Sequence, residues 1–500
     1  MKIGYWQIIG QNKGENVEKI KNILKISENW KKVFVILVGI YVIAISALIR
    51  ADYDYIDDMG RAAYGYTGWE ERFSRYLSTF LSHMIHAGTF LSDISPFPQL
   101  LAIIILAISS VLIIKILVGE DEKCSLWEII AVIPVGLSPY FLECISYKYD
   151  SPYMAISIFA SVFPILFYQC GMIQYYVSVI IGTIAVCTTY QAGAGIFPMI
   201  IVVIALEHWN KGKKINEVIK YIFQSAVPYL IGMGIYKFFI MKTVTSYVEN
   251  GIAAPREILQ HYIQYFTIVK SDFKTVWCYC IAIICIGFII EKVYTSKQNK
   301  ILSLILSSSA VFVMGILSWG LYPALKQPLM APRAMYGFGV FIALLGVATV
   351  KNKSKYFYVL KLVCVVLSWC FIVLALTYGN ALVAQEEYTD MRMNAVVMDL
   401  NTLDCMKKDT EKDIQIKGSI GQAPIIRNKP QNNQILNRLI PITFRENWYW
   451  GSYKLCNYYG IQNLKPVKEI DLAKKNLPIL KDTMYHTIYG NSKNILIELK

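Results

Sequence analysis

The sequence predicts an α-helical polytopic membrane protein with a small α/β domain at its C-terminal end. Hydrophobic residues make up 55% of the 500 residues and charged residues 17%, whereas soluble domains carry about 25% charged residues. Apolar runs close to the roughly 20 residues that a spanning helix needs recur between residues 33 and 377. Beyond residue 377 the apolar runs shorten, and Asn, Lys and Asp become more frequent.

About eleven transmembrane helices are expected. With the Lys-rich residues 1–32 in the cytoplasm, this count places every cluster of lysines between spans on the cytoplasmic side, as the positive-inside rule requires. One missed span would move the later clusters outside. The expected spans are residues 33–49, 100–118, 127–145, 154–169, 175–190, 196–209, 221–240, 275–290, 301–319, 338–350 and 357–377.

This topology divides the chain into a cytoplasmic segment (1–32), a transmembrane domain (33–377) and an extracytoplasmic C-terminal domain (378–500). In the last part, "DIQIKGS" (413–419) and "NILIELK" (494–500) alternate as half-buried strands do. The stretch "NAVVMDLNTL" (394–403) predicts a helix, so we expect a small α/β domain. An amphipathic helix is expected on the external side, around "PREILQHYIQYFTIV".

The formal net charge of +14 does not indicate nucleic-acid binding. The basic residues that produce it gather in short loops between spans, and these loops lack the interleaved aromatic residues that stack on bases. Most of the eleven cysteines lie in or beside apolar segments and fit small buried residues. Cys405 and Cys456 lie in the polar C-terminal part, where they could form a disulfide.

The first external loop, residues 50–98, concentrates charges at the mouth of the first span. It begins "RADYDYIDDMGRAAYGYTGWEERFSRYLSTF". Charges near lipid are costly and persist where they face water, a partner or a substrate. Arginines can neutralise a lipid phosphate, and a carboxylate can take the proton from an attacking sugar hydroxyl. The alternative is a solvated loop with no chemistry.

The stretch "RFSRYLSTFLSHMIH" in the same loop has apolar residues at helical spacing. It predicts a helix lying flat on the membrane, with Arg72 and Arg75 near the lipid headgroups. Three other external stretches are candidates for the same site: Lys148, Tyr149 and Asp150; Tyr190 and Gln191; and Arg333. Their simpler interpretations are a lone salt bridge, helix packing through small residues, and an ordinary loop arginine.

These motifs resemble the bacterial Gtr type II family of serotype-converting (O-antigen) glucosyltransferases. That family carries an Asp-Asp-x-Gly-Arg stretch in its first external loop, matched here by Asp57-Asp58-Met59-Gly60-Arg61. A Gly-x-x-Gly-Trp-like stretch follows at residues 65–69, and an Arg-Pro-Leu-like stretch at 75–77, where Tyr76 replaces the proline. The segments "SPYFLECISYKYDSPYMAIS" (138–157) and "YQAG" (190–193) look like further signatures.

The resemblance implies an inverting glycosyltransferase of the membrane-embedded C-type (GT-C) fold, in the cytoplasmic (inner) membrane of a bacterium. Such enzymes move a sugar, here glucose by analogy, from a polyprenyl-phosphate donor such as undecaprenyl-phosphate glucose to a cell-surface glycan outside that membrane. A related polysaccharide polymerase, another sugar transferase, and a flippase for lipid-linked sugars are the alternatives. A flippase needs a polar path through the bilayer, but here the charges gather on one face.

The resemblance places catalysis in the first external loop, at Asp57 and Asp58, with Asp58 preferred as the base. The adjacent carboxylates could instead bind a divalent ion such as Mg²⁺ or Mn²⁺. The expected phosphate-binding residues are Arg61, Arg75, Lys148 and Arg333. The expected substrate-binding residues are Tyr66, Trp69, Tyr149, Asp150, Tyr190 and Gln191.

Overall fold

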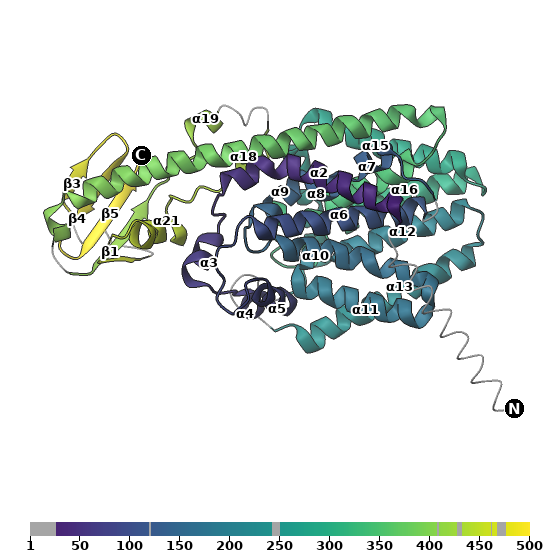
Figure 1. Ribbon diagram of the computed structural model, residues 1–500, viewed down its shortest axis with the longest axis horizontal. Helices are drawn as coiled ribbons and strands as arrows, with labels where there is room; N and C mark the ends of the chain where they lie inside the picture. The colour runs from purple at the N-terminus through teal and green to yellow at the C-terminus, as the bar shows by residue number, and fades with distance from the viewer. Residues whose placement is uncertain are drawn as a thin grey trace.

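The fold is described by a computed structural model that covers residues 27–119, 122–242, 251–407, 410–427, 433–461, 463–467 and 477–500. Most of the expected cytoplasmic segment, residues 1–26, lies outside the described residues. A bundle of apolar helices forms the larger part of the molecule, and a small sheet lies beyond one end of it (Figure 1).

Nine helices of the described chain are long and apolar enough to cross a membrane, which makes this a multi-pass membrane protein. Several of them end or begin in 3-10 or π turns. They are α2 (Glu28–Ala51), α6 (Phe97–Val118), α10 (Ser151–Val162) with η1 (Phe163–Cys170), α11 (Met172–Thr189), η2 (Gln191–Gly195) with α12 (Ile196–Asn210), α13 (Ile215–Ile235) with η3 (Tyr236–Ile240), α15 (Thr275–Thr295), α16 (Lys300–Leu317), and η6 (Lys355–Phe357) with α18 (Tyr358–Asn401).

The two remaining predicted spans are helical but irregular. Residues 126–146 form α7 (Leu126–Val132), α8 (Pro134–Leu137) and α9 (Pro139–Ser146), with a bend of 55° before α9. Proline lacks the backbone N–H that a continuous helix needs, so Pro134 and Pro139 explain the breaks. α17 (Gly337–Val350) has 14 residues, all buried within the bundle. Counting the bent pair as one span gives up to ten, against about eleven predicted.

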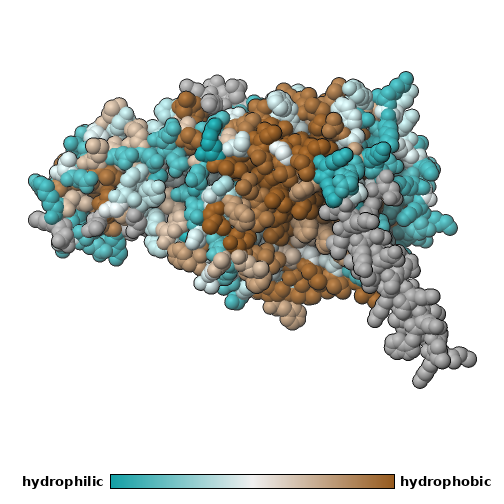
Figure 2. All heavy atoms as spheres, viewed as in Figure 1, coloured by the Kyte–Doolittle hydropathy of each residue, from teal (hydrophilic) through white to brown (hydrophobic). Residues whose placement is uncertain are grey.

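The surface of the bundle has the polarity expected of a membrane protein. Figure 2 shows hydrophobic residues gathered over the helical body, with hydrophilic residues at both of its ends and over the C-terminal part. Exposed apolar side chains on the helices, such as Ile181 on α11 and Phe223 on α13, are 62% and 65% exposed. Such exposure is stable in lipid, because lipid tails solvate these side chains.

The loop between α2 and α6 folds into three short helices at the end of the bundle that faces the C-terminal part (Figure 1). They are α3 (Asp58–Tyr64), α4 (Trp69–Phe73) and α5 (Tyr76–Ile85). The helix predicted for residues 72–86 is therefore interrupted between α4 and α5, where Ser74 adopts a left-handed conformation with φ 55°. The predicted amphipathic helix is α14 (Pro255–Asp272). Two short 3-10 turns, η4 (Tyr322–Ala324) and η5 (Pro332–Ala334), lie in the Pro-rich connection before α17.

α18 connects the bundle to the C-terminal part without a break. Its 44 residues correspond to about 66 Å at 1.5 Å per residue, which exceeds a bilayer core of about 30 Å. The helix extends past the sheet in Figure 1, and the expected domain boundary at residue 378 falls inside it. Its last turns contain the predicted helix 394–403.

The C-terminal sheet has five strands in the order β2-β1-β5-β4-β3. β1 pairs in parallel with β2 and β5, whereas β4 is antiparallel to β3 and β5. The two predicted strands are confirmed as β1 and β5. Cys405 and Cys456 are both free thiols. The strands and remaining helices are β1 (Lys412–Lys417), β2 (Leu464–Pro466), β3 (Ile479–Asp482), β4 (His486–Gly490), β5 (Asn494–Leu499), η7 (Asp404–Lys407), α19 (Pro424–Arg427), α20 (Leu436–Leu439), α21 (Tyr449–Tyr453) and η8 (Lys454–Tyr458).

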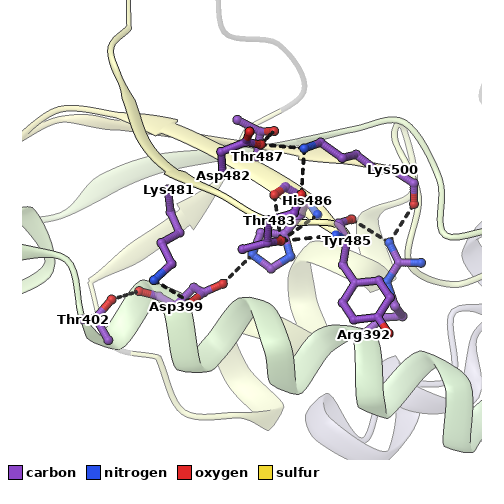
Figure 3. Close-up of polar contacts among 10 residues, drawn as sticks. All are labelled: Arg392, Asp399, Thr402, Lys481, Asp482, Thr483, Tyr485, His486, Thr487 and Lys500. Carbon is purple, nitrogen blue, oxygen red and sulfur yellow. Dashed lines mark hydrogen bonds and ion pairs between the residues drawn. The ribbon is translucent and has the colours of Figure 1, made fainter.

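Polar contacts attach the sheet to the last turns of α18 (Figure 3). Arg392 donates hydrogen bonds to the carbonyl oxygens of Tyr485 and Lys500, at 2.7 and 2.8 Å. Asp399, two turns further on, lies 3.0 Å from Nε2 of the buried His486 and 3.4 Å from Nζ of Lys481. The helix and the sheet therefore form one unit rather than two loosely connected segments.

Candidate active site

Asp58 lies at the start of α3 with no solvent exposure. α2 ends at Ala51, and the left-handed conformation of the next residue, Asp52, turns the chain into the loop. One Asp58 oxygen, Oδ2, accepts hydrogen bonds from the backbone N–H groups of Lys148 and Tyr55, at 2.9 and 3.2 Å. Burial raises the pKa of the Asp58 carboxyl well above its usual range, despite the nearby Arg61 charge. Asp58 thus connects the loop after α2 to the loop before α10.

Arg61 and Asp150 form a buried ion pair beside Asp58. Nη1 of Arg61 lies 2.7 Å from Oδ2 of Asp150 and 3.9 Å from Oδ1 of Asp58. The guanidinium also stacks on the buried Trp69 ring, with 4.8 Å to its centroid. Arg61 of α3 is therefore neutralised by Asp150, the residue just before α10, which lies 89 residues further along the chain.

Asp57 is the more accessible of the two adjacent carboxylates. It precedes α3 and is half-buried, and among the described residues no cation lies within ion-pair distance of it. The burial of Asp150 raises the pKa of its own carboxyl; the charge of Asp57 raises it further, and Arg61 and Arg75 lower it. Asp57, Asp150, Arg61 and Arg75 therefore act on one another within a single electrostatic site.

Arg75 lies at the same site without a carboxylate partner among the described residues. Its Nε donates a hydrogen bond of 3.0 Å to Oε1 of Gln191, and its guanidinium lies 4.3 Å from the centroid of the Tyr190 ring. Gln191 donates in turn to the carbonyl of Phe73 and the hydroxyl of Tyr236, at 2.9 and 3.1 Å. These contacts fix the position of Arg75 at the end of α11.

Lys148 does not present a free charge. Its ammonium lies 2.8 Å from Asp52, 2.9 Å from Asp54 and 3.8 Å from Asp93. These carboxylates raise the pKa of Lys148 although burial opposes them. Two acidic residues directly after α2, Asp52 and Asp54, and a third near the end of the same loop, Asp93, therefore surround one buried lysine.

Arg333 is paired with Glu143, a residue that sequence reasoning missed. Both the backbone N–H and the guanidinium of Arg333 donate to the Glu143 carboxylate, at 2.6 and 2.5 Å. Glu143 is a buried carboxylate in the apolar stretch of α9. An ionisable residue inside an apolar run is itself a signal of a functional or structural partner. Arg333 keeps a 25% exposed side chain and lies 5.8 Å from the Tyr147 ring centroid.

The four predicted aromatic residues lie in different surroundings. Trp69 is buried and packs edge-on against Tyr153. Tyr149 is also buried, and its ring stacks on His86 at 5.9 Å. Tyr190 stacks on Tyr336 at 6.0 Å, and its buried hydroxyl has no hydrogen-bond partner among the residues that the structure describes. Tyr66 is half-buried. Burial raises the pKa of its hydroxyl, the charge of Arg61 lowers that pKa, and the charge of Asp57 raises it.

The adjacent carboxylates do not fit a divalent-cation site. A hard cation requires several free oxygen ligands, but one oxygen of Asp58 accepts two backbone N–H groups and the other faces Arg61. Within the described ranges, no group of three or more His, Cys, Asp or Glu side chains is arranged to hold a metal ion.

The sequence model of the family described as "Glucosyl transferase GtrII" matches residues 46–344. The chain belongs to this family. The matched range begins at the end of α2, ends in α17 and includes all the candidate residues described above.

A relative from Salmonella phage P22, named "Uncharacterized 55.3 kDa protein in gtrB 5'region", is 27% identical over 455 residues. The alignment covers 86% of this chain and 90% of the phage protein, so the similarity reaches into the C-terminal part. No solved structure matches the chain at a significant level.

The Arg61–Asp150 pair in this glucosyltransferase family member is expected to dominate local stability. Its side chains are 6% and 9% exposed, and removing one partner of a buried ion pair costs about 3–5 kcal/mol. We expect Asp150→Ala to lower the free energy of unfolding by about that amount, and Arg61→Met combined with Asp150→Leu to recover most of it. Thermal unfolding of the purified protein in detergent measures this.

The matched control for that comparison is Asp404→Ala. Asp404 pairs with Lys407 at 2.7 Å, but both side chains are largely exposed, so the change is expected to stay within about 0.5 kcal/mol. If Asp150→Ala unfolds at the wild-type temperature, the buried pair does not organise the site.

Proposed function

We propose that this protein is an inverting glucosyltransferase that transfers glucose from a polyprenyl-phosphate donor, such as undecaprenyl-phosphate glucose, to a surface glycan on the outer face of the cytoplasmic membrane. The observation that carries the proposal is the meeting of Asp57, Asp150, Arg61 and Arg75 at one end of a bundle of apolar helices. This arrangement occurs in a chain of the GtrII glucosyl transferase family. A lipid-borne substrate places its reactive group at such an end.

The charges at the opposite end of the spans support an external position for the site. Lys351 pairs with Glu207 at 3.0 Å, and the N–H of Lys297 donates to the carbonyl of Asn210. These contacts bring together the connections after α12, after α15 and after α17. Lys211, Lys213 and Lys353 lie in the same connections, as the positive-inside rule favours for a cytoplasmic end.

In the proposed reaction, Asp57 accepts the proton from an acceptor hydroxyl as the hydroxyl oxygen attacks the anomeric carbon of the donor. The bond between that carbon and the phosphate oxygen breaks, and polyprenyl phosphate leaves with the bonding electrons. One attack from the opposite face inverts the anomeric configuration. Inverting transfer needs one base and a stabilised leaving group, without a second nucleophilic carboxylate.

The geometry favours exchanging the roles first assigned to the two carboxylates. Asp58 is fully buried and engaged by two backbone N–H groups, whereas Asp57 is accessible and unpaired among the described residues. We therefore assign the base to Asp57 and a positioning role to Asp58. A general base must reach the proton that it takes.

Arg75 is the best placed cation for the leaving phosphate. Negative charge on that phosphate grows in the transition state, so a cation fixed in advance stabilises the transition state more than the ground state. Arg75 is held by Gln191 and Tyr190 and has no carboxylate to neutralise it among the described residues. Arg61 and Lys148 are neutralised by their own carboxylates and shape the site instead.

An apolar groove gives the prenyl chain of the donor a place beside this site. The groove has a volume of about 470 Å³ and runs along α10, η1 and α11. Ile156 lines it and also packs against the cluster that contains Trp69 and Tyr153, so the groove reaches the neighbourhood of Arg61. Its other lining residues are Phe159, Ala160, Phe163, Pro164, Phe167, Gln174, Val177, Ser178, Ile181, Gly182 and Ala185.

Filling the groove is expected to weaken binding of the donor chain. Ala185→Phe places a ring in the groove and should raise KM for undecaprenyl-phosphate glucose by about tenfold, since each buried methylene contributes about 0.8 kcal/mol. KM for a donor with a single isoprene unit should stay unchanged. The control is Ile173→Phe on the same helix, which is 78% exposed and outside the groove. Equal effects on both donors would rule out the groove as the chain site.

The proposal is tested with membranes that contain the protein, radiolabelled undecaprenyl-phosphate glucose and the glycan of the host. Label is expected to move from the lipid fraction to the glycan. If the label stays in the lipid fraction although the protein is correctly inserted, the donor assignment is wrong. A panel of other lipid-linked sugars then separates a different donor from a non-enzymatic function.

A further inference from the structure

A second cavity opens between the helical bundle and the C-terminal part, next to the site described above. It has a volume of about 420 Å³ and is lined on one side by η5 and Glu143, and on the other by residues of the segment 437–448. Three arginines and one glutamate line it, so its wall is basic. The lining residues are Tyr55, Ile56, Glu143, Ala331, Pro332, Arg333, Asn437, Arg438, Ile440, Pro441, Ile442, Arg445 and Trp448. We call this cavity the interdomain cleft.

The wall that the C-terminal part contributes is fixed by hydrogen bonds to the bundle. The carbonyl of Leu439 accepts from the hydroxyls of Tyr55 and Tyr378, at 2.7 and 3.1 Å. Arg438 forms an ion pair with Asp272 of α14 and donates to the carbonyl of Met330. The cleft is therefore preorganised, and a ligand that binds there does not have to order the segment first.

Arg445 supplies a charge to the cleft that nothing in the described chain neutralises. No carboxylate of the described residues lies within ion-pair distance of it, and its guanidinium lies 4.6 Å from the centroid of the Trp448 ring. The indole Nε1 of Trp448 is buried and has no hydrogen-bond partner in the described structure. A free guanidinium and an unused donor together fit an oxyanion, because a guanidinium fork matches phosphate oxygens.

The cleft adjoins the proposed base. Ile56 lines the cleft and directly precedes Asp57 in the chain. Arg333 also lines the cleft, and its guanidinium lies over the ring of Tyr147. The charges of Asp57 and Asp150 are close enough to Tyr147 to raise the pKa of its hydroxyl. A ligand held in the cleft can thus present a neighbouring group to Asp57. The donor chain groove lies along α10 and α11, and the two cavities share no lining residue.

We propose that the interdomain cleft binds a phosphate or diphosphate group of the glycan acceptor, with Arg445 and Trp448 as its ligands. This inference rests on the proposed function for the identity of the acceptor but not for the binding of the anion. The anion could belong to a lipid-linked glycan, which carries a diphosphate, or to a phosphate within a free glycan.

The first test is calorimetric titration of the purified full-length protein in detergent with inorganic diphosphate. Arg445→Gln should weaken binding by about tenfold or more, as expected for one charge-assisted hydrogen bond. The matched control Arg427→Gln, an exposed arginine of α19 outside the cleft, should bind as wild type does. Unchanged affinity in Arg445→Gln, or loss of binding in Arg75→Gln alone, would place the anion elsewhere and overturn the proposal.

The second test uses transfer kinetics and separates the two possible sources of the anion. Arg445→Gln should raise KM for the acceptor while leaving KM for the donor unchanged. If the effect appears with the lipid-linked glycan but not with the delipidated glycan, the anion is the lipid diphosphate; an effect with both indicates a phosphate of the glycan. A rise in donor KM alone would contradict the cleft assignment. If wild type transfers no glucose, the proposed function fails, but the titration still reports on the cleft.

Discussion

Asp57→Asn is expected to lower kcat for glucosyl transfer by about 10²- to 10⁴-fold, the range over which a positioned general base contributes. Asparagine keeps the shape of the side chain but cannot accept the hydroxyl proton. Because Asp57 is half-buried and unpaired among the described residues, its replacement should leave insertion and thermal stability unchanged. Single-turnover transfer from labelled undecaprenyl-phosphate glucose measures the effect on chemistry.

Two further variants make this comparison decisive. Asp58→Asn should retain more activity than Asp57→Asn, because burial already raises the pKa of Asp58 and an amide oxygen can still accept the N–H groups of Lys148 and Tyr55. Asp93→Asn replaces a 41% exposed carboxylate of the same loop and should remain within about twofold of wild type. If Asp58→Asn is the inactive variant and Asp57→Asn is not, Asp58 is the base.

Arg75→Gln is expected to lower kcat by about 10²- to 10³-fold, as found for the loss of one transition-state donor. The reason is that the variant loses the cation which faces the leaving phosphate, while Gln191 and Tyr190 stay in place. Arg75→Lys should recover part of the rate, because it restores the charge but not the planar geometry. The rate of polyprenyl phosphate release in a single turnover measures this step.

Arg72→Gln is the control for Arg75. Arg72 lies in α4 of the same loop, three residues away, and is exposed; among the described residues no hydrogen bond or ion pair joins its side chain to the site. Its replacement should change kcat little. A loss of rate as large in Arg72→Gln as in Arg75→Gln would show that general surface charge, rather than a fixed cation, supports transfer.

The sequence predicted the class of fold well because a bilayer imposes a strong and repetitive pattern. Every expected span is helical, and the strands at 413–417 and 494–499 follow from simple alternation. The pattern could not show that α17 is a short helix buried on all sides. Apolar residues are equally favourable against lipid and against other helices, so the sequence does not distinguish the two environments. The hydrophobic pattern also could not show that α18 continues past residue 378. The pattern marks where a helix leaves the membrane, but not where a helix that continues outside the membrane ends.

The candidate site was predicted as a list of residues but not as a set of pairs. Asp57, Arg61, Arg75 and Asp150 do meet. What the sequence could not reveal is which charges cancel, because the partners are far apart in the chain. Lys148 is neutralised by Asp52 and Asp54. The spacing of residues in the sequence does not predict the contact between Arg333 and Glu143.

The accessibility of the two adjacent carboxylates also depends on tertiary contacts. In the sequence Asp57 and Asp58 are equivalent neighbours. In the fold, the start of α3 turns Asp58 inward onto the backbone N–H groups of Lys148 and Tyr55, while Asp57 stays at the surface of the site. The exchange of their proposed roles rests on that difference.

The most direct test of the central claim is a comparison of donors with the purified protein. The protein is incubated with the host glycan and either undecaprenyl-phosphate glucose or uridine diphosphate glucose, and glucosylated glycan and polyprenyl phosphate are quantified by mass spectrometry. The account predicts glucosylated glycan from the lipid donor alone, with one polyprenyl phosphate released per glucose transferred. Transfer from the soluble nucleotide sugar without any lipid donor would contradict it.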